Sequence, residues 1–427
     1  MVVIVVDEIS PRINYTFKQV FELFLNVQYK VVVNSTDEKN NFILNYSTRK
    51  FENANLNIVP SGLLNEAGIK NVIPSFSQDK DEVKLFLNDS EKFGFDFFSA
   101  IFWMITRYEE HNSSEFDNHN RFPAKNSFAF KNNFLEIPVV DVWVNELAKI
   151  IGQVLPGFIP NQQFSILNTI DVDNAFAYKG KDFARKIGAF SRDLLKGKLA
   201  ENKKRRDVLT GNETDPYDTY EYIKAQTHSK NIETIFFHLV GEKAKHDRNI
   251  KVDSAEYKKL LGELKVWSKQ GLHPSYASNS IDGRIKEEKS WLEKSVEVSV
   301  NSSRQHFLMM RFPKTYADLV QAGITNDYSM GFADEIGFRA GTSRSFYFFN
   351  LQSNQEMPLL VHPFCLMDGT LRDYLKLGIE ESKTRIIKMV QLLKKMNLRY
   401  IAIWHNETLS ETNGWEGWRA VYEAQFI

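Results

Sequence analysis

The alternation of short apolar strands with longer helical segments in the second half of the chain most constrains its fold. The strand-like runs span residues 164–172, 234–237, 271–273, 302–308, 358–364 and 400–404. Helical periodicity recurs between them, at residues 256–270, 283–294, 314–322 and 380–395. Strands joined by helices form parallel sheets that helices cover. So many of these units favour an α/β fold closed into a barrel over residues 161–427.

Residues 1–160 are predicted to form a smaller α/β domain of their own. Its strand-like runs cover residues 2–6 and 30–34, and its helical segments cover residues 16–27, 96–109 and 139–155. Pro156, Gly157 and Pro160 then interrupt the helical pattern. We therefore predict a domain boundary after residue 160.

Charge balance gives no reason to expect a polyanionic partner. The chain has 427 residues, and its 54 basic and 54 acidic residues cancel. Binding to nucleic acid or to an anionic membrane surface depends on an excess of positive charge, so we expect neither partner. The basic stretch at residues 179–206 also contains carboxylates, which is typical of a solvated helix.

The apolar segments and the single cysteine indicate the environment of the protein. No run approaches the roughly 20 apolar residues of a membrane span. Residues 1–6 are apolar, but Asp7 and Glu8 follow at once, which predicts a first strand rather than a signal peptide. Cys365 alone excludes an internal disulfide and a cysteine-based zinc site. We expect a soluble globular protein in the cytoplasm.

Two carboxylates close the first predicted strand of the second half. Asp171 and Asp173 are two residues apart, and the period of a strand directs them to the same side. Like charges this close need a cation, a hydrogen-bond donor or a shared proton between them. The pair therefore indicates a metal site or an acid–base site, with a helix cap or an Asx turn as the structural alternative.

Histidines gather at the same predicted strand ends. Five of the nine histidines lie there: His238, His273, His306, His362 and His405. Each alone is compatible with a hydrogen-bonded core or rim residue, but the strand ends of an α/β barrel converge on one pocket. One carboxylate with two neutral imidazoles suits zinc or a similar divalent ion and leaves a position for water.

The order of these motifs resembles a known family. The motifs are T-I-D-V-D at 169–173, T-I-F-F at 234–237, G-L-H-P-S-Y at 271–276, S-R-Q-H-F at 303–307 and I-A-I-W-H at 401–405. Together they are similar to the polysaccharide deacetylases of the NodB homology type, in the manner of carbohydrate esterase family 4. The resemblance implies a bacterial branch with a distorted (β/α) barrel over residues 161–427 and an additional N-terminal domain. It also implies a hydrolase that removes an N-acetyl group from an amino sugar or glycan precursor.

The resemblance assigns roles to particular residues. It implies that Asp171 is the catalytic base and that Arg304 orients it. His405 would protonate the departing amine. Asp173 and His273 would bind a divalent metal, most simply zinc, which supplies an activated water and polarises the acyl carbonyl.

The sequence departs from the family pattern at Ala277, where the family has a second histidine ligand. His306 is the candidate for the third ligand, because it lies two residues after Arg304 on a predicted strand and so points to the same side. His238 is the next choice. The alternatives are a hydrolase of another non-peptide C–N bond and a glycan-binding relative that has lost the metal.

Three further residues are predicted to contact the carbohydrate. Tyr276 and Trp404 adjoin the predicted site loops, and aromatic faces can pack on sugars. Arg339 lies between glycines in G-F-R-A-G-T-S, where it could bind a carboxylate, a phosphate or the acetate product. The alternatives are core burial for the aromatic rings and a structural salt bridge for Arg339.

Overall fold

The computed structural model describes residues 1–34, 41–155, 157–158, 163–181 and 199–427. The chain folds into two compact units. Unit 1 consists of Met1–Phe164, Met310–Val320 and Ser329–Cys365, and unit 2 consists of Ser165–Met309, Gln321–Tyr328 and Leu366–Ile427. The predicted boundary after residue 160 and residues 182–198 of the predicted basic helix lie outside the described residues. Unit 1 thus takes two segments from the second half of the chain in addition to the predicted N-terminal domain.

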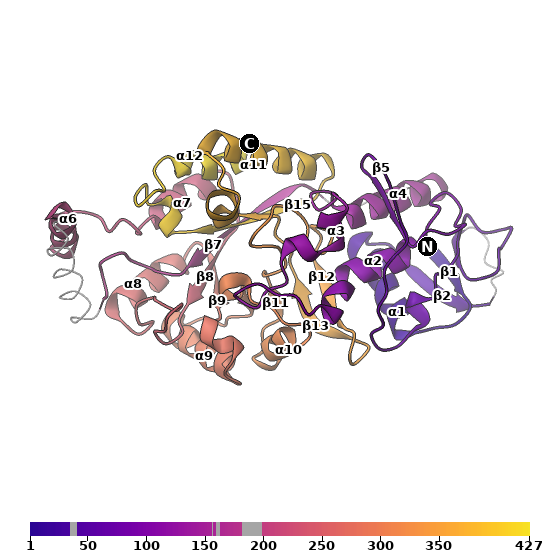
Figure 1. Cartoon of the computed structure of the whole chain (residues 1–427), viewed down its shortest axis with the longest axis horizontal. Helices are drawn as coiled ribbons and strands as arrows, with labels where there is room; N and C mark the ends of the chain where they lie inside the picture. The colour runs from indigo at the N-terminus through magenta and orange to yellow at the C-terminus, as the bar shows by residue number, and fades with distance from the viewer. Residues whose placement is uncertain (35–40, 156, 159–162, 182–198) are drawn as a thin grey trace. The chain divides into compact units, whose positions relative to one another are not determined.

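Unit 2 is built on a parallel sheet with the strand order β11-β10-β9-β8-β7-β15-β14 (Figure 1). Its strands are β7 (Ser165–Val172), β8 (Thr234–Leu239), β9 (Lys269–His273), β10 (Ser302–Ser303), β11 (Asn326–Asp327), β14 (Leu366–Met367) and β15 (Arg399–His405). The central strand β8 is buried at every residue, as expected for a strand covered on both faces. The parallel α/β arrangement is confirmed. Among the described residues β14 pairs only with β15, so the sheet is open at this edge and the barrel stays a prediction.

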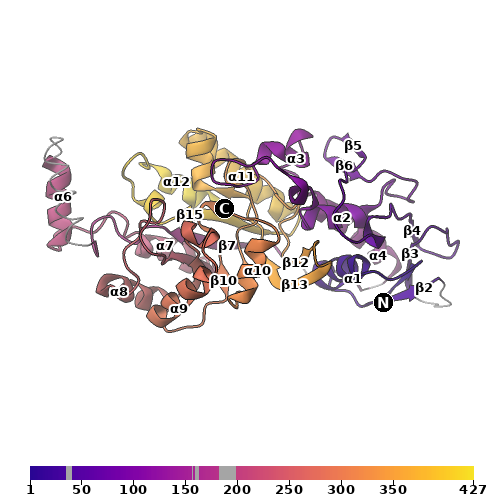
Figure 2. The same cartoon turned by 60° about the horizontal axis from the view of Figure 1, so that its bottom comes forward.

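Helices connect and cover these strands. They are α6 (Leu199–Leu209), α7 (Tyr220–His228), α8 (Ala255–Leu264), α9 (Arg284–Val296), α11 (Ile379–Lys395) and α12 (Trp418–Glu423). Helix α11 packs on β15 and on α12, whereas α9 packs on β9 and on α8. Figure 2 shows the same two groups, with α11 and α12 together and α8 beside α9. The sheet is therefore covered by two helical groups.

The strand predicted at residues 302–308 is mostly wrong. Strand β10 ends at Ser303, and His306–Leu308 form a 3-10 turn. Phe307 and Leu308 have φ values of 59° and 54°, in the left-handed region that non-glycine residues rarely adopt. The chain turns sharply here, so the period of a strand does not relate the directions of Arg304 and His306.

Unit 1 contains a four-stranded parallel sheet with the order β2-β1-β3-β4. Its strands are β1 (Val2–Val6), β2 (Tyr29–Val33), β3 (Phe42–Tyr46) and β4 (Leu56–Ile58). β1 is fully buried, which confirms the strand predicted at residues 2–6. Two antiparallel hairpins complete the strands of this unit: β5 (Phe76–Asp79) with β6 (Glu82–Leu85), and β12 (Phe346–Asn350) with β13 (Gln355–Val361).

The helices of unit 1 pack an aromatic core. They are α1 (Pro11–Phe17) with a π-helical continuation (Lys18–Phe24), α2 (Phe97–Ile105), α3 (Phe128–Lys131), α4 (Val139–Val154) and α10 (Lys314–Gln321, of which Gln321 belongs to unit 2). Every residue of α2 is buried, and Phe98 packs its ring against those of Phe17 and Tyr46. The aromatic residues of α2 therefore belong to the core of unit 1.

Short helical turns occur in both units. The 3-10 turns are Leu63–Asn65, Tyr108–Asn112, Ala124–Asn126, Tyr276–Asn279, His306–Leu308, Glu407–Leu409 and Ala424–Phe426, and a π-helical turn spans Thr370–Tyr374. Within the described parts of the chain, no helix has the length and apolar character needed to cross a membrane.

Candidate metal centre and catalytic site

The strand registers of unit 2 bring the polar residues to one edge of the sheet. His405 of β15 lies opposite Asp171 of β7, and His273 of β9 lies opposite Leu239 of β8. Parallel strands present their carboxyl ends at the same edge, where α/β proteins place their chemistry. The candidate site is therefore positioned by the sheet itself.

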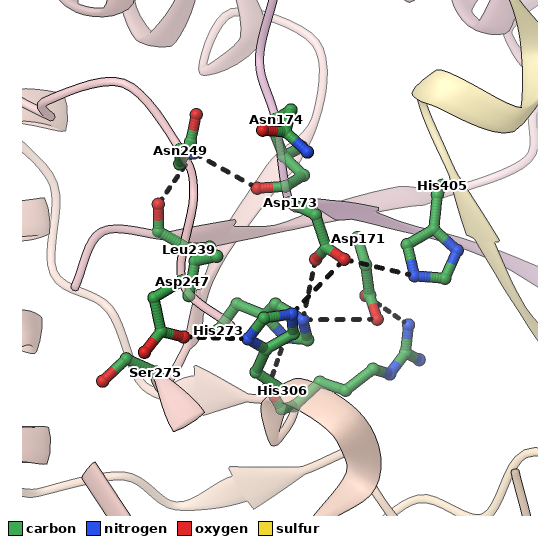
Figure 3. A network of polar contacts seen from close by, with 12 residues as sticks. Asp171, Asp173, Asn174, Leu239, Asp247, Asn249, His273, Ser275, His306 and His405 are labelled. Atoms are coloured by element: carbon green, nitrogen blue, oxygen red, sulfur yellow. Dashed lines mark hydrogen bonds and ion pairs between the residues drawn. The ribbon is translucent and has the colours of Figure 1, made fainter. Parts of the chain in front are cut away.

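Asp173, His273 and His306 form a compact cluster at this edge. Asp173 Oδ1 lies 3.2 Å from His273 Nε2, and Asp173 Oδ2 lies 3.4 Å from His306 Nε2. One ligand atom from each residue falls within 4.8 Å of the others. Figure 3 shows both imidazoles directed toward the Asp173 carboxylate. These are three donors of the types that zinc accepts.

Hydrogen bonds fix the orientation of both imidazoles. His273 Nδ1 donates to the Arg304 carbonyl oxygen at 2.6 Å, and His306 Nδ1 donates to Asp247 Oδ1 at 3.1 Å. Each bond places a proton on Nδ1, so Nε2 is the nitrogen that faces Asp173 and could bind a metal. Such outer partners set the tautomer of histidines that bind metals.

Two atoms of the cluster lack hydrogen-bond partners. Asp173 Oδ1 and His273 Nε2 are buried and have no hydrogen-bond partner among the described residues. Buried polar atoms without partners are rare because their desolvation is not compensated. A divalent ion between the carboxylate and the two imidazoles would satisfy them, so the residues present fit such an ion.

The pKa values of Asp173 and His306 are shifted by the charges of their neighbours in the site. Burial alone would raise the pKa of Asp173, but His306 and His273 hold it well below its usual range. Burial alone would lower the pKa of His306, but Asp173 and Asp247 raise it to about 9. The site therefore stabilises a carboxylate that carries its full charge.

His238, the other candidate for a third ligand, has its ring nitrogens engaged elsewhere. They lie 3.0 Å from the Tyr257 hydroxyl and 2.7 Å from Gln270 Oε1. The side chain is fully buried, and this burial lowers its pKa to about 4. His238 is a satisfied core histidine. His362 belongs to unit 1, where its Nδ1 lies 2.7 Å from Ser345 Oγ.

Arg304 holds the Asp171 carboxylate. Its Nη1 donates to Asp171 Oδ1 at 2.9 Å, and its Nη2 donates to Thr169 Oγ1 at 2.9 Å. Its Nε donates to the Tyr328 carbonyl oxygen at 3.1 Å. The guanidinium is fully buried, so this pairing is desolvated and directional. Asp171 Oδ2 remains 3.8 Å from His273 Nε2, at the margin of the cluster.

Asp368 holds His405 on the other side of the cluster. Its carboxylate accepts bonds from His405 Nδ1 (2.9 Å), the His405 backbone N–H (2.8 Å) and Thr408 Oγ1 (2.7 Å). Burial alone would lower the pKa of His405, but the Asp368 charge raises it well above its usual value. The Asp368 charge therefore favours the protonated form of His405. Its Nε2 lies 3.9 Å from Asp173 Oδ2.

Asp247 and Asp368 are site residues that sequence reasoning missed. Asp368 directly follows β14, so the rule that found Asp171 at a strand end could also have found it. Asp247 lies in a polar loop after β8, in the run K-H-D-R, and nothing local distinguishes it from its neighbours. Its role appears only in three dimensions, since it accepts from His306 Nδ1 and the Tyr276 backbone N–H.

The predicted substrate contacts need correction at two of three positions. Arg339 lies in unit 1 and is 2% exposed, and its Nε and Nη2 bind the Glu110 carboxylate at 2.9 and 2.5 Å. Trp404 is fully buried, and its Nε1 donates to Gln425 Oε1 at 3.2 Å. Arg339 thus forms a buried ion pair inside unit 1, and Trp404 packs in the core of unit 2. Tyr276 is half-buried, with its ring 4.4 Å from that of His246.

Comparisons with known proteins add a family and several similar structures. Residues 2–156 match a family described as a family of unknown function, DUF7033. No curated protein matches the sequence. A crystal structure designated a polysaccharide deacetylase from Mycobacterium smegmatis is similar at 11% identity and a TM-score of 0.39, covering 64% of this chain and 84% of that one. A polysaccharide deacetylase from Bacillus cereus is similar at 10% identity and a TM-score of 0.29, covering 62% and 86%. At these scores the function has to be argued from the site.

Proposed function

We propose that this protein is a metal-dependent hydrolase that removes an N-acetyl group from an amino sugar or glycan precursor. The observation that carries the proposal is the cluster of Asp173, His273 and His306 between two supported side chains, Asp171 and His405. A divalent metal held by the cluster, zinc by its ligand chemistry, would polarise the acyl carbonyl and activate water.

Asp171 is the base in this proposal. Its carboxylate takes the proton from the water that attacks the acyl carbon. Arg304 compensates the negative charge of Asp171 and fixes its orientation through Nη1. Because Thr169 and the Tyr328 carbonyl hold the same guanidinium, Arg304 is a positioning residue.

His405 is the acid. Its Nδ1 is bound by Asp368, so its Nε2–H is the proton available on the side of the cluster. It passes that proton to the amide nitrogen as the C–N bond breaks, since an amine anion is a poor leaving group. Water has then added its oxygen to the acyl carbon, and the products are acetate and a free amino sugar.

A group of rings beside the cluster supports a carbohydrate substrate. The Phe307 ring lies 4.7 Å from that of His306 and 5.3 Å from those of Tyr276 and His246. Phe307, Tyr276 and His246 are all partly exposed. Partly exposed aromatic faces can pack on the apolar face of a sugar.

A deacetylation assay on the zinc-loaded full chain tests the proposal. The substrates are chitooligosaccharides and a non-sugar acetamide of similar size, and acetate and new free amine are both quantified. We expect equal amounts of acetate and amine from the sugar, and none from the Asp171→Asn variant. Turnover of only the non-sugar amide would support a different C–N hydrolase. Glycan binding without acetate release would support a non-catalytic relative.

A further inference from the structure

Unit 2 contains a cavity that is not lined by any residue of the metal cluster. Its volume is about 690 Å³, within the range of small-molecule sites. It lies between the loop that follows β8 and the helices α8 and α9. The side chains that characterise it are Lys243, Lys251, Lys258, Lys294, Asp253 and Trp291.

The charge of this cavity is positive in a chain whose net charge is zero. Its four lysines form no ion pair among the described residues. The carboxylate of Glu242, which also lines the cavity, is neutralised by Arg284 Nη1 at 3.3 Å. Asp253 alone then offsets the lysines. By contrast, Lys259 and Lys289 on the same two helices pair with Glu263 and Glu293.

The cavity also has an apolar lining. Val240, Ile250 and Val252 line it together with the half-buried indole of Trp291. The Arg284 guanidinium, which pairs with Glu242 and Glu287, lies 5.6 Å from the Trp291 ring. Clustered ammonium groups bind phosphate, and an indole face binds an apolar or aromatic group. The lysines and the apolar lining together fit an organic phosphate better than a bare inorganic anion.

The loop that forms this cavity is held in place. Asn249 accepts a bond from the Ala175 backbone N–H at 3.0 Å and donates to the Leu239 carbonyl at 2.7 Å. Two residues earlier, Asp247 binds His306. Figure 3 shows Asn249 and Asp247 on the side of the site that this loop forms. The cavity is therefore preformed, and its loop also supports a proposed metal ligand.

We infer that this lysine pocket, formed by Lys243, Lys251, Lys258, Lys294 and Trp291, binds a phosphorylated organic compound. The phosphate lies among the ammonium groups, and the organic portion lies against the indole. The inference goes beyond the proposed deacetylation, because no residue of the metal cluster lines the pocket. The phosphate belongs either to the substrate of the metal site or to a separate ligand.

Calorimetric titration of the full chain with uridine diphosphate and with pyrophosphate tests the pocket. Chelator-treated protein is used, so that phosphate cannot bind through a metal ion. In the variant Lys258→Glu/Lys294→Glu we expect affinity to fall by about 10-fold or more, as charge-assisted hydrogen bonds are lost. The matched control is Lys259→Glu/Lys286→Glu, which changes the same charge on the same helices outside the pocket. Circular dichroism establishes that both variants are folded.

Three results would overturn the inference: no binding by the unmodified protein, equal affinity in the pocket variant, or equal loss in the control. Binding should persist in Asp173→Ala, which separates the pocket from the metal cluster.

If the phosphate is part of the substrate, the pocket variant raises KM for a phosphorylated N-acetyl sugar and leaves KM for a neutral N-acetyl sugar unchanged. If the ligand is separate, uridine diphosphate changes turnover of the neutral sugar in the unmodified protein only. If the protein binds uridine diphosphate but turns over no substrate, the result counts against the deacetylase function and leaves the inference about the pocket intact.

Discussion

The imidazole of His306 faces the carboxylate of Asp173, with Nε2 3.4 Å from Oδ2. In the family that the sequence resembles, the corresponding nitrogen comes from the position of Ala277. Here the Ala277 backbone N–H instead donates to Asp247 at 3.3 Å, and Asp247 in turn holds His306. The segment that contains Ala277 thus helps to hold His306, the proposed third ligand.

Removal of His306 should weaken the metal site. In His306→Ala we expect zinc affinity to fall by about 10-fold or more, the scale of losing a partner of a metal site. His362→Ala is the control, since His362 lies in unit 1 and binds Ser345. Competition with a chromophoric chelator measures both affinities. An unchanged affinity in His306→Ala would leave His306 as a rim histidine.

Asp171→Asn should separate metal binding from turnover. The amide cannot accept the proton of the attacking water, so we expect turnover to fall by about 100-fold or more. Zinc content should stay at the level of the unmodified protein, because Asp171 lies outside the ligand cluster. Loss of zinc together with turnover would show that Asp171 is a ligand instead.

His405→Ala should affect substrates according to their leaving groups. We expect turnover of acetylated amines to fall by about 100-fold or more, whereas aryl acetates, which need little protonation, should change much less. Equal losses on both substrates would remove His405 from the role of acid.

Asp368→Asn should change the pH profile of the same step. Asp368 raises the pKa of His405. An acid works in its protonated form, so activity falls as pH rises through its pKa. Without the Asp368 charge this decline should begin at lower pH, and profiles of kcat for the two proteins measure the shift. Superimposable profiles would contradict the pairing.

A buried carboxyl group outside the site predicts how stability varies with pH. Burial raises the pKa of Glu288 from 4.5 to about 7, despite its bonds to the Ser275 N–H and hydroxyl. The folded state then holds the proton more tightly than the unfolded state, so stability falls as pH rises from about 4.5 to about 7. Relative to Glu288→Gln, the unmodified protein should lose up to about 3 kcal/mol across this window. Urea unfolding at both ends of the window, with Glu287→Gln as the exposed control, measures the difference. If the difference in the free energy of unfolding between the unmodified protein and Glu288→Gln is the same at both pH values, the prediction is contradicted.

Local chemistry explains which features could be predicted from the sequence. The run Val2–Val6 is apolar throughout and is β1, and the alternation of strands and helices correctly indicated a parallel sheet. His306 lies beside Asp173, but the expected reason was wrong, because a 3-10 turn with left-handed Phe307 directs it there. Arg339 was misinterpreted because its partner, Glu110, lies far away in the sequence, where no local pattern reveals an ion pair.

The metal content of the purified full chain tests the central claim most directly. Elemental analysis follows incubation with zinc and removal of the excess, on the unmodified protein and on Asp173→Ala in parallel. We predict about one zinc ion per chain in the unmodified protein, as in catalytic sites with three protein ligands, and almost none in the variant. The claim would be contradicted by an unmodified protein that retains no divalent ion, or by equal zinc in both proteins.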